Sequence, residues 1–285
     1  MTAEGLQNRT FLVTGANSGI GRALVEALAA RAARVVLAAR SAERTAPVLE
    51  AVRARYPQAA ASFLQVDLAD LGSVREAAGR FLAGGQGLDV LVNNAGVAGT
   101  FGLSKDGFDL TYATNHLGPF LLTSLLLPRL RESHDARIVN VSSVAHMRVR
   151  GIDWALLERR TSPRRSGFYD YGVTKLFNVI HAKELARRLT GTPVRTYSLH
   201  PGGVASNIWR ALPGPVQWLL KLFLISNEEG ARTSFFCATA PELSNSSGKY
   251  YVRCREATCN PLANDPSLGT ELWARSEAAV DSRSA

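Results

Sequence analysis

The stretch "RTFLVTGANSGIG", residues 9–21, joins an apolar run to a glycine-rich turn, and this junction decides the fold. It leads into "GRALVEALAARA" at 21–32, whose apolar residues recur at helical spacing. Gly15, Gly19 and Gly21 allow a tight turn and a close approach to a pyrophosphate, whose charge is favoured at a helix N-terminus. The GxxxGxG spacing differs from the usual GxGxxG fingerprint, and such a turn can also be purely structural. Its place between a strand and a helix favours phosphate binding.

Outward from this junction, short β-type runs alternate with helical patterns. The runs after the first are 34–40, 62–68, 88–96, 136–143, 194–202 and 248–254. Continuous apolar strands separated by helices are typical of a parallel sheet with both faces covered. We therefore expect a single α/β domain over 1–277, a doubly wound parallel sheet of about seven strands with helices on both faces. The closing helix reads as 267–279, and residues 278–285 read as a polar, frayed tail.

The composition is that of an ordinary soluble protein, with 46% hydrophobic and 20% charged residues among 285. The net charge of +9 would suit an anionic ligand, a nucleic acid or an acidic membrane. The arginines are scattered and no stripe of basic and aromatic residues accompanies them, so we expect a solvated basic surface and no nucleic-acid partner.

The cysteines and the N-terminal residues bear on location. Three cysteines without a CxxC pair suggest neither a metal site nor a disulfide framework, and they fit a reducing compartment. The opening "MTAEGLQNRT" contains no apolar run and so offers no signal peptide or anchor. We expect a cytoplasmic protein without a bound metal.

The end of the second strand separates two cofactors. NAD-binding sheets usually carry an acidic residue there for the ribose 2′-hydroxyl, but this strand ends in Ala39 and Arg40. A guanidinium can hold a 2′-phosphate with two hydrogen bonds. The sequence therefore favours NADP(H) over NAD(H), although Arg40 can also be read as one more surface arginine.

Two further strands end in residues suited to a cofactor edge. "VDL" at 66–68 places Asp67 toward the adenine, and "NNAG" at 93–96 places small residues beside the cofactor path. Either could be a plain turn. Their position at the carboxyl ends of strands, where doubly wound sheets bind ligands, favours contact.

The stretch "GFYDYGVTK" at 167–175 contains two tyrosines, of which Tyr171 has Lys175 at i+4 on the same helix face. An unperturbed tyrosine has a pKa near 10, and an adjacent ammonium with a nicotinamide cation would lower that pKa toward a useful range. Tyr169 has Val173 at that offset, which leaves it as a wall of the substrate pocket. The pair gains weight from "IVNVSS" at 138–143, whose hydroxyls could hold a substrate oxygen.

A proline marks a helix irregularity upstream. Pro119 lies four residues after Asn115, so it cannot supply the N–H that the Asn115 carbonyl would accept. We expect a kink that frees this carbonyl to bind a water on a path to Lys175. An irregularity without function is the alternative.

These motifs together resemble the short-chain dehydrogenase/reductase family from residue 9 to about residue 253, with a Rossmann-type fold. TGxxxGIG at 14–21, NNAG at 93–96, Asn115, the serine that ends the fifth strand and YxxxK at 171–175 follow the family's order. By position, the resemblance implies a catalytic tetrad of Asn115, Ser143, Tyr171 and Lys175, with Tyr171 as general acid/base. It implies these cofactor contacts: Gly15, Asn17, Ser18, Gly19, Ile20, Gly21, Arg40, Asp67, Leu68, Asn94, Ala95, Gly96, Tyr171, Lys175, Pro201, Gly202, Val204 and Ser206.

The resemblance is stronger to the retinol dehydrogenase-like branch. The insert at 144–170 is longer than in many family members, and "NHLGPFLLT" at 115–123 and "VSSVAH" at 141–146 are similar to that branch. The apolar segment at about 207–226 would be a substrate lid, with core packing, a subunit contact and, for 208–226, a membrane surface as alternatives.

The function implied is hydride transfer between nicotinamide C4 and the carbonyl or alcohol carbon of a lipophilic substrate, such as retinal, another aldehyde, a ketone or a secondary alcohol. Relatives often form homodimers or homotetramers, which we expect here too. The alternative is a non-catalytic NADP-binding sensor or interaction protein on the same fold.

Overall fold

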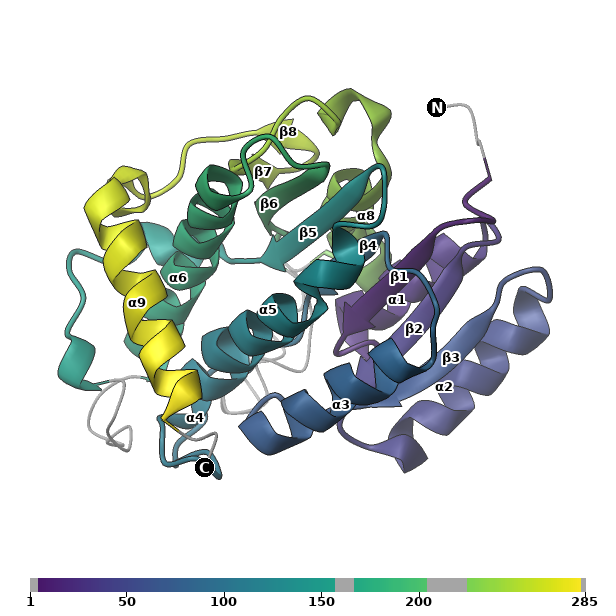
Figure 1. Ribbon diagram of the computed structural model, residues 1–285, viewed down its shortest axis with the longest axis horizontal. Coiled ribbons are helices and arrows are strands. Elements are labelled where there is room, and N and C mark those ends of the chain that lie inside the picture. Colours follow the sequence, from purple (N-terminus) through teal and green to yellow (C-terminus); the bar gives the residue numbers. More distant parts are fainter. Residues whose placement is uncertain (1–4, 157–166, 204–224, 283–285) are drawn as a thin grey trace.

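A single, mostly parallel sheet runs through the centre of the computed structural model, which describes residues 5–156, 167–203 and 225–282 (Figure 1). Within these residues the sheet has eight strands in the order β3-β2-β1-β4-β5-β6-β7-β8. The strands are β1 Thr10–Thr14, β2 Arg34–Ala39, β3 Ala61–Gln65, β4 Val90–Asn93, β5 Ala136–Val141, β6 Val194–His200, β7 Lys249–Val252 and β8 Arg255–Glu256. The predicted α/β class is confirmed. The sequence pattern missed only β8, two exposed residues that pair antiparallel with β7.

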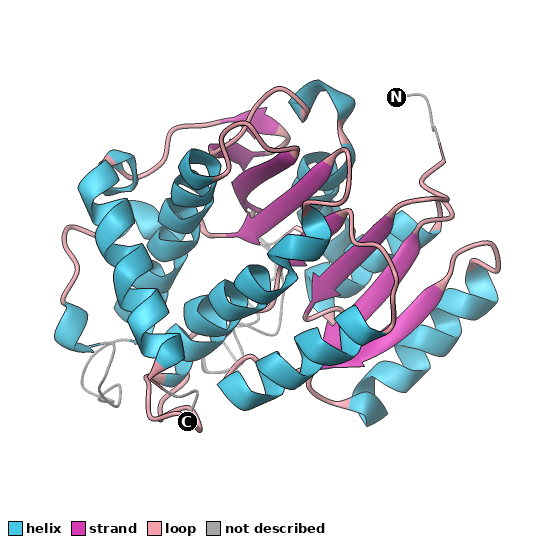
Figure 2. Cartoon of the chain, viewed as in Figure 1, coloured by secondary structure: helices cyan, strands magenta, loops and turns pink. Residues whose placement is uncertain are grey.

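Helices cover both faces of the sheet (Figure 2). One face packs against α3, α5, α6 and α9, and the other against α1, α2 and α8. The helices are α1 Gly19–Ala29, α2 Ala42–Arg55, α3 Leu71–Ala83, α4 Leu110–Tyr112, α5 Gly118–Leu130, α6 Gly167–Arg188, α8 Asn227–Thr239 and α9 Pro266–Asp281. Because both faces are covered, β1, β4 and β5 are buried along their whole length, which explains their unbroken apolar sequences.

The strand order reverses beside β1, which pairs with β2 on one side and with β4 on the other. Connections leave the carboxyl ends of β1 and β4 in opposite directions, so a crevice opens between them. The glycine-rich turn after β1 and the residues 94–96 after β4 both lie at this point.

The predicted irregularity near Pro119 takes the form of a π-helical turn, η1 Ala113–Leu117, between α4 and α5. The Gly118 N–H bonds the Ala113 carbonyl five residues earlier. A wider turn accommodates a proline that can make no i−4 bond. The turn contains Asn115.

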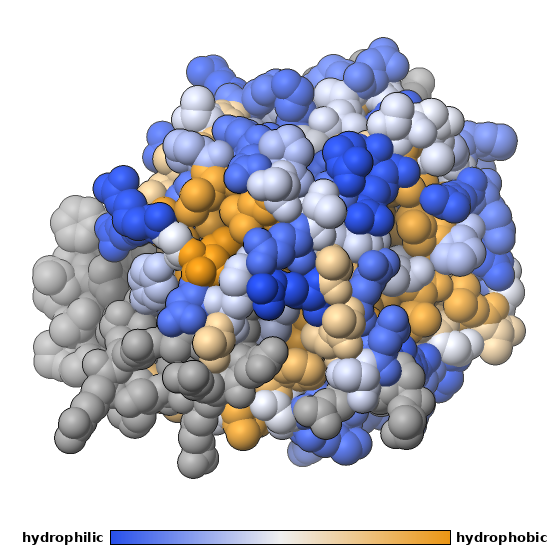
Figure 3. All heavy atoms as spheres, turned by 60° about the vertical axis from the view of Figure 1, so that its left-hand side comes forward, coloured by the Kyte–Doolittle hydropathy of each residue, from blue (hydrophilic) through white to orange (hydrophobic). Residues whose placement is uncertain are grey.

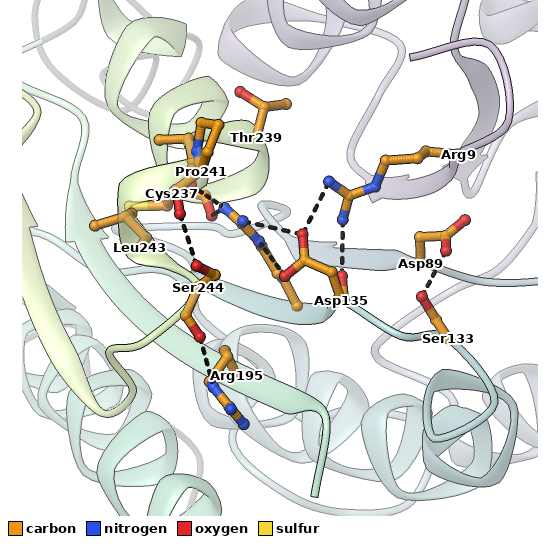
Figure 4. A network of polar contacts seen from close by, with 12 residues as sticks. Arg9, Asp89, Ser133, Asp135, Arg195, Cys237, Thr239, Pro241, Leu243 and Ser244 are labelled. Atoms are coloured by element: carbon orange, nitrogen blue, oxygen red, sulfur yellow. Dashed lines mark hydrogen bonds and ion pairs between the residues drawn. The ribbon is translucent and has the colours of Figure 1, made fainter. Parts of the chain in front are cut away.

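A buried arginine, Arg137, bonds the beginning of β5 to the end of α8, and Figure 4 labels its partners Asp135 and Cys237. The Arg137 side chain is only 1% exposed and donates to the carbonyls of Cys237, at 3.3 Å, and Ala240, at 2.8 Å. Its second terminal nitrogen lies 3.0 Å from the Asp135 carboxylate, which also pairs with Arg9 at 3.1 Å. The network joins the N-terminal segment, β5 and α8 at the amino ends of the strands, away from the glycine-rich turn.

The C-terminal helix extends further than the sequence pattern indicated. It continues to Asp281, and Val280 is buried against the core, so the predicted tail from residue 278 begins too early. On the side of the molecule turned forward in Figure 3, apolar side chains gather in separate patches between hydrophilic ones. Among the described helices, none has the length and hydropathy needed to cross a bilayer.

Candidate functional site

The glycine-rich turn has the geometry of a close-approach loop. Gly15 and Gly19 adopt φ of 66° and 54°, the left-handed region that favours glycine. A Cβ on Gly21 would clash with the Gly15 carbonyl and with the Asn94 side chain. The turn therefore needs glycine for its own packing as well as for a ligand.

The N-terminus of α1 differs from those of α2, α3, α8 and α9. Side chains cap α2, α3, α8 and α9, through Ser41, Asp70, Ser226 and Asp265 respectively. In the described structure Ser18, the N-cap of α1, makes no such bond, and the first turn of α1 has no acidic residue. Its first N–H groups and the helix dipole therefore suit a phosphate, so the residues fit a dinucleotide.

The "NNAG" segment is tied to the end of β1. Thr14 accepts bonds from the backbone N–H groups of Asn94 and Ala95 through its hydroxyl, both at 3.0 Å, and the Asn94 amide donates to the Thr14 carbonyl at 2.8 Å. Asn94, predicted to contact the cofactor, thus also positions the segment. Thr14 was not singled out from the sequence, although it opens the TGxxxGIG motif.

At the ends of β2 and β3 lies a polar hollow of about 420 Å³. Its charged lining residues are Arg40, Asp67, Asp70, Glu76, Arg80 and Lys105. Lys105 lies 2.7 Å from Asp70 and Arg80 lies 3.6 Å from Glu76, whereas Arg40 lies 3.9 Å from Asp67. Arg40 and Lys105 are both largely exposed, but the ion pair of Arg40 is the longer one, so its guanidinium is held more loosely than the Lys105 ammonium. Leu68 was also predicted to contact the cofactor. Its carbonyl lies so close to Gly118 that a Cβ on that glycine would clash with it.

The two serines after β5 have different surroundings. The Ser142 hydroxyl is buried and donates to the Lys175 carbonyl at 2.6 Å, which fixes β5 to α6. The Ser143 side chain interacts with Tyr171 in a way that lowers the pKa of the tyrosine, and it accepts from the Ala145 N–H at 3.3 Å. The structure therefore brings Ser143, and not Ser142, to the Tyr171 hydroxyl.

Lys175 lies one helical turn from Tyr171, with its ammonium 5.6 Å from the ring centroid. The ammonium donates to the Val141 carbonyl at 2.9 Å, and burial lowers its pKa to about 8. The sequence predicted a lowered pKa for Tyr171. In this structure burial raises the pKa of Tyr171, against a smaller lowering by the Ser143 hydrogen bond. The prediction relied on a nicotinamide cation as well as on Lys175, and burial dominates in the protein alone.

Asn115 is fully buried and acts through its side chain. Its amide oxygen accepts from the Val97 N–H at 2.8 Å, and its amide nitrogen donates to the Val97 carbonyl at 2.9 Å and to the Thr174 hydroxyl at 3.0 Å. A Cβ on Gly96 would lie 3.1 Å from the Lys175 ammonium and 3.2 Å from the Asn115 amide oxygen. Asn115 therefore clamps the segment after β4 against α6, a role that the sequence did not predict.

Other predicted residues lie at the margin. Tyr169 is 44% exposed and donates to the Gly151 carbonyl at 2.9 Å, away from the Ser143 pair. Gly202 follows Pro201 after β6 with φ of 101°. Val204, Ser206 and nearly all of the predicted lid fall outside the described residues. In the part of the chain that the structure describes, no group of three histidine, cysteine or acidic side chains could hold a metal.

Comparisons with known proteins agree with this geometry. The sequence profile of the short chain dehydrogenase family matches residues 9–155. Dehydrogenase/reductase SDR family member 13 from Bos taurus is 41% identical over 94% of this chain and 72% of its own length. The chain belongs to the short-chain dehydrogenase/reductase family.

Further relatives locate the branch. Retinol dehydrogenase 12 from Mus musculus is 38% identical over 94% of this chain and 85% of its own length. A crystal structure of an uncharacterized protein from Mycobacterium Paratuberculosis superposes with a TM-score of 0.77 at 32% identity, covering 99% of this chain and 97% of that one. The retinol dehydrogenase-like resemblance of the sequence is confirmed.

The family is one of oxidoreductases that bind a nicotinamide cofactor and act on alcohols or carbonyls. In this member the four predicted tetrad residues lie around the carboxyl ends of β4 and β5 and the first turns of α6. Thr174 and Ser142 support them from directly beside Lys175 and Ser143. Both are ordinary hydroxyl residues, which sequence inspection alone does not distinguish from surface serines and threonines.

Proposed function

We propose that this protein is an NADP(H)-dependent oxidoreductase that interconverts a lipophilic carbonyl compound and its alcohol, with Tyr171 as general acid/base. The observation that carries the proposal is the placement of Tyr171 against the Ser143 side chain and one helical turn from the buried Lys175, whose ammonium lies 5.6 Å from the Tyr171 ring centroid. When bound, the nicotinamide cofactor supplies the hydride for reduction and takes it up in oxidation.

In the reductive direction, Ser143 orients the substrate oxygen and Tyr171 donates the phenolic proton to it as the carbonyl carbon gains the hydride. Burial raises the pKa of Tyr171, which keeps the phenol protonated and ready to donate. The Lys175 ammonium, mostly charged at pH 7 with a pKa of about 8, stabilises the phenolate that remains. Solvent then returns the proton to Tyr171.

The test is an assay of aldehydes, ketones and alcohols, retinal included, with NADPH and NADH in parallel. Tyr171→Phe keeps the ring and removes the proton donor, so we expect turnover to fall by about 10²-fold or more, while NADPH binding persists. Tyr169→Phe, on the same helix, is the matched control and should retain turnover. Full turnover by Tyr171→Phe would refute the mechanism, and binding without turnover on every substrate would favour the non-catalytic sensor.

Arg40 supports the preference for NADP(H). Of the three cations that line the polar hollow, Arg40 has the longest ion-pair distance, so it is the one most available to a phosphate. Arg40→Leu should weaken NADPH binding by about tenfold to a hundredfold, the loss of a charge-assisted phosphate contact, and leave NADH binding within about threefold. Arg255→Leu, which removes an exposed arginine on β8, is the control. Cofactor fluorescence titration measures all of these affinities, and equal losses for NADPH and NADH would count against a 2′-phosphate contact.

The lipophilic substrate is supported by exposed apolar side chains on the segments that follow β4 and β5. Phe101, Leu103, Val144 and Met147 are each between 41% and 57% exposed. Val144 directly follows Ser143, so one of these exposed apolar side chains adjoins the proposed reaction centre in the chain. Retinal is the first substrate to assay because relatives at 38–39% identity are named retinol dehydrogenases.

The remaining expectations stay proposals with their own tests. A cytoplasmic location is in keeping with three free cysteines, and cell fractionation tests it. Sedimentation equilibrium distinguishes a monomer from the expected homodimer or homotetramer. Vesicle flotation tests membrane contact through 208–226, which lies almost wholly outside the described residues.

A further inference from the structure

The loop after β5 is fastened by a buried histidine. His146 lies in the short helix η2, Val144–Arg148, and its side chain is fully buried. Both its backbone N–H, at 3.1 Å, and its ring Nδ1, at 2.5 Å, bond the Ser143 carbonyl. His146 therefore fixes the peptide group of the residue whose side chain meets Tyr171.

A residue from the C-terminal part of the chain holds His146 in turn. Asn260, which is 3% exposed, donates its backbone N–H to His146 Nε2 at 3.2 Å. Its side-chain amide donates to the carbonyls of His146, at 2.8 Å, and Val149, at 2.9 Å, while its amide oxygen accepts from the Leu262 N–H at 2.9 Å. Tyr250 packs edge-on against the imidazole at 5.0 Å.

The partners determine the protonation of the ring. A backbone N–H can only donate, so Nε2 must be unprotonated, and the Ser143 carbonyl can only accept, so Nδ1 must carry the proton. Burial lowers the pKa of His146, which favours this neutral form. The ring thus transmits the position of Asn260 to Ser143 through one accepting and one donating nitrogen.

The braced loop also packs directly against the helix that carries the tyrosine. A Cβ on Gly172 would lie 3.1 Å from the Ala145 carbonyl and 3.4 Å from a Val149 methyl group. Both contact atoms belong to the loop that Asn260 and His146 hold. Movement of this loop would therefore change the distance between Ser143 and Tyr171.

We propose that His146 and Asn260 are positioning residues that set Ser143 against Tyr171, so that segment 257–264 completes the reaction centre from outside the family's tetrad. The inference rests on the proposed function, since it assigns Ser143 and Tyr171 to catalysis. Neither residue touches the substrate or the reacting atoms. Their contribution acts through the orientation of Ser143.

The experiment compares graded variants of the full-length protein. His146→Leu removes both ring bonds, whereas the amide nitrogen of His146→Asn can still donate to the Ser143 carbonyl. Asn260→Ala removes the side-chain bonds to the loop and keeps the backbone donor. We expect kcat to fall by about tenfold to a hundredfold in His146→Leu and Asn260→Ala, the usual cost of losing a residue that orients a reacting group, with KM and NADPH affinity within about threefold. His146→Asn should recover part of kcat.

The matched control is His181→Asn, which alters another buried histidine, on α6, whose ring packs against Phe120 and Trp273 rather than against this loop. It should lower thermal stability without changing kcat of the folded protein. Unchanged kcat in both His146→Leu and Asn260→Ala would overturn the positioning role, as would losses that His181→Asn reproduces in full.

Hydrogen exchange separates this inference from the proposed function. In Asn260→Ala, backbone amides of residues 141–150 should exchange faster, and in His181→Asn they should not. Exchange that stays at the wild-type rate in Asn260→Ala refutes the brace whether or not a substrate is known. If the wild-type protein shows no turnover, the proposed function fails while this result still decides the brace.

Discussion

Ser142 and Ser143 are adjacent in sequence and chemically identical, yet their surroundings give Ser142 a structural role and Ser143 a proposed catalytic one. Ser143→Ala removes the group that meets Tyr171 and should lower kcat by about a hundredfold or more, as for other lost polarising donors. Ser142→Ala removes a buried bond to the Lys175 carbonyl and should cost about 1–2 kcal/mol of unfolding free energy with kcat retained. Steady-state kinetics and urea unfolding of the two variants provide the comparison. The reverse pattern would show that the tetrad serine has been misassigned.

A second prediction concerns Lys175, whose replacement should abolish activity and yet increase stability. Burial lowers its pKa from 10.5 to about 8, so the unfolded chain binds more protons between these values and stability should rise with pH across that window. At pH 7 the buried ammonium costs about 3 kcal/mol, partly offset by about 1 kcal/mol from its bond to Val141. Lys175→Met should therefore be inactive and yet about 1–2 kcal/mol more stable. Denaturant unfolding at pH 7 measures this, and a destabilised variant would contradict it.

The sequence located the residues of the proposed tetrad, whereas it did not identify the residues that support them. Tyr171 and Lys175 follow from helical spacing alone, because i and i+4 side chains share a face whatever the rest of the fold does. Asn115 was located correctly beside Lys175, but its role as a clamp on Val97 depends on a loop 18 residues away. Contacts of that kind leave no local pattern in a sequence.

At the scale of elements, the junction of β5 and α8 depends on Arg137. Its guanidinium is the donor for carbonyls at the end of α8, so Arg137→Met leaves those carbonyls without that donor and Asp135 with one cation fewer. We expect the unfolding free energy to fall by about 3 kcal/mol, typical for breaking a buried pair. Lys105→Met, which removes an exposed lysine from its pair with Asp70, is the control and should change stability much less. Equal effects in the two variants would argue against an anchoring role for Arg137.

Elements differed in how well their sequences predicted them. Strands buried on both faces were evident because short continuous apolar runs between turn residues are typical of a covered parallel sheet. β8 was missed because its two residues are exposed and charged. The end of α9 was placed too early because residues 277–281 contain only one large apolar side chain, the buried Val280. The sequence predicted a kink near Pro119, and the structure has a π-helical turn there. The proline forbids one hydrogen bond but does not determine which wider turn results.

For the whole molecule, buried histidines should set the acid limit of stability. Burial lowers the pKa of His181 and His200 to about 4 and holds that of His116 well below its ordinary value. Unfolded histidines bind protons near 6.5, so the unfolded chain takes up more protons and stability should fall as pH drops from about 6.5 to 4. Each such histidine contributes a slope of up to about 1.4 kcal/mol per pH unit.

Urea unfolding at several pH values between 7 and 4.5 measures this slope. His181→Asn removes one titrating ring and should make the slope shallower, even though the variant is less stable at pH 7. A stability that stays constant from pH 6.5 to 5 would show that these rings take up as many protons in the folded protein as in the unfolded chain, and would contradict the lowered pKa values.

The bond between Asn260 and His146 joins residues 114 positions apart, and this separation bears on how the protein is made. A ribosome releases the glycine-rich turn, Ser143 and Tyr171 long before residue 260 emerges. A nascent chain can therefore contain every tetrad residue while the serine loop still lacks its brace. The same order of synthesis means that the site reaches its proposed final geometry only after residue 260 has left the ribosome.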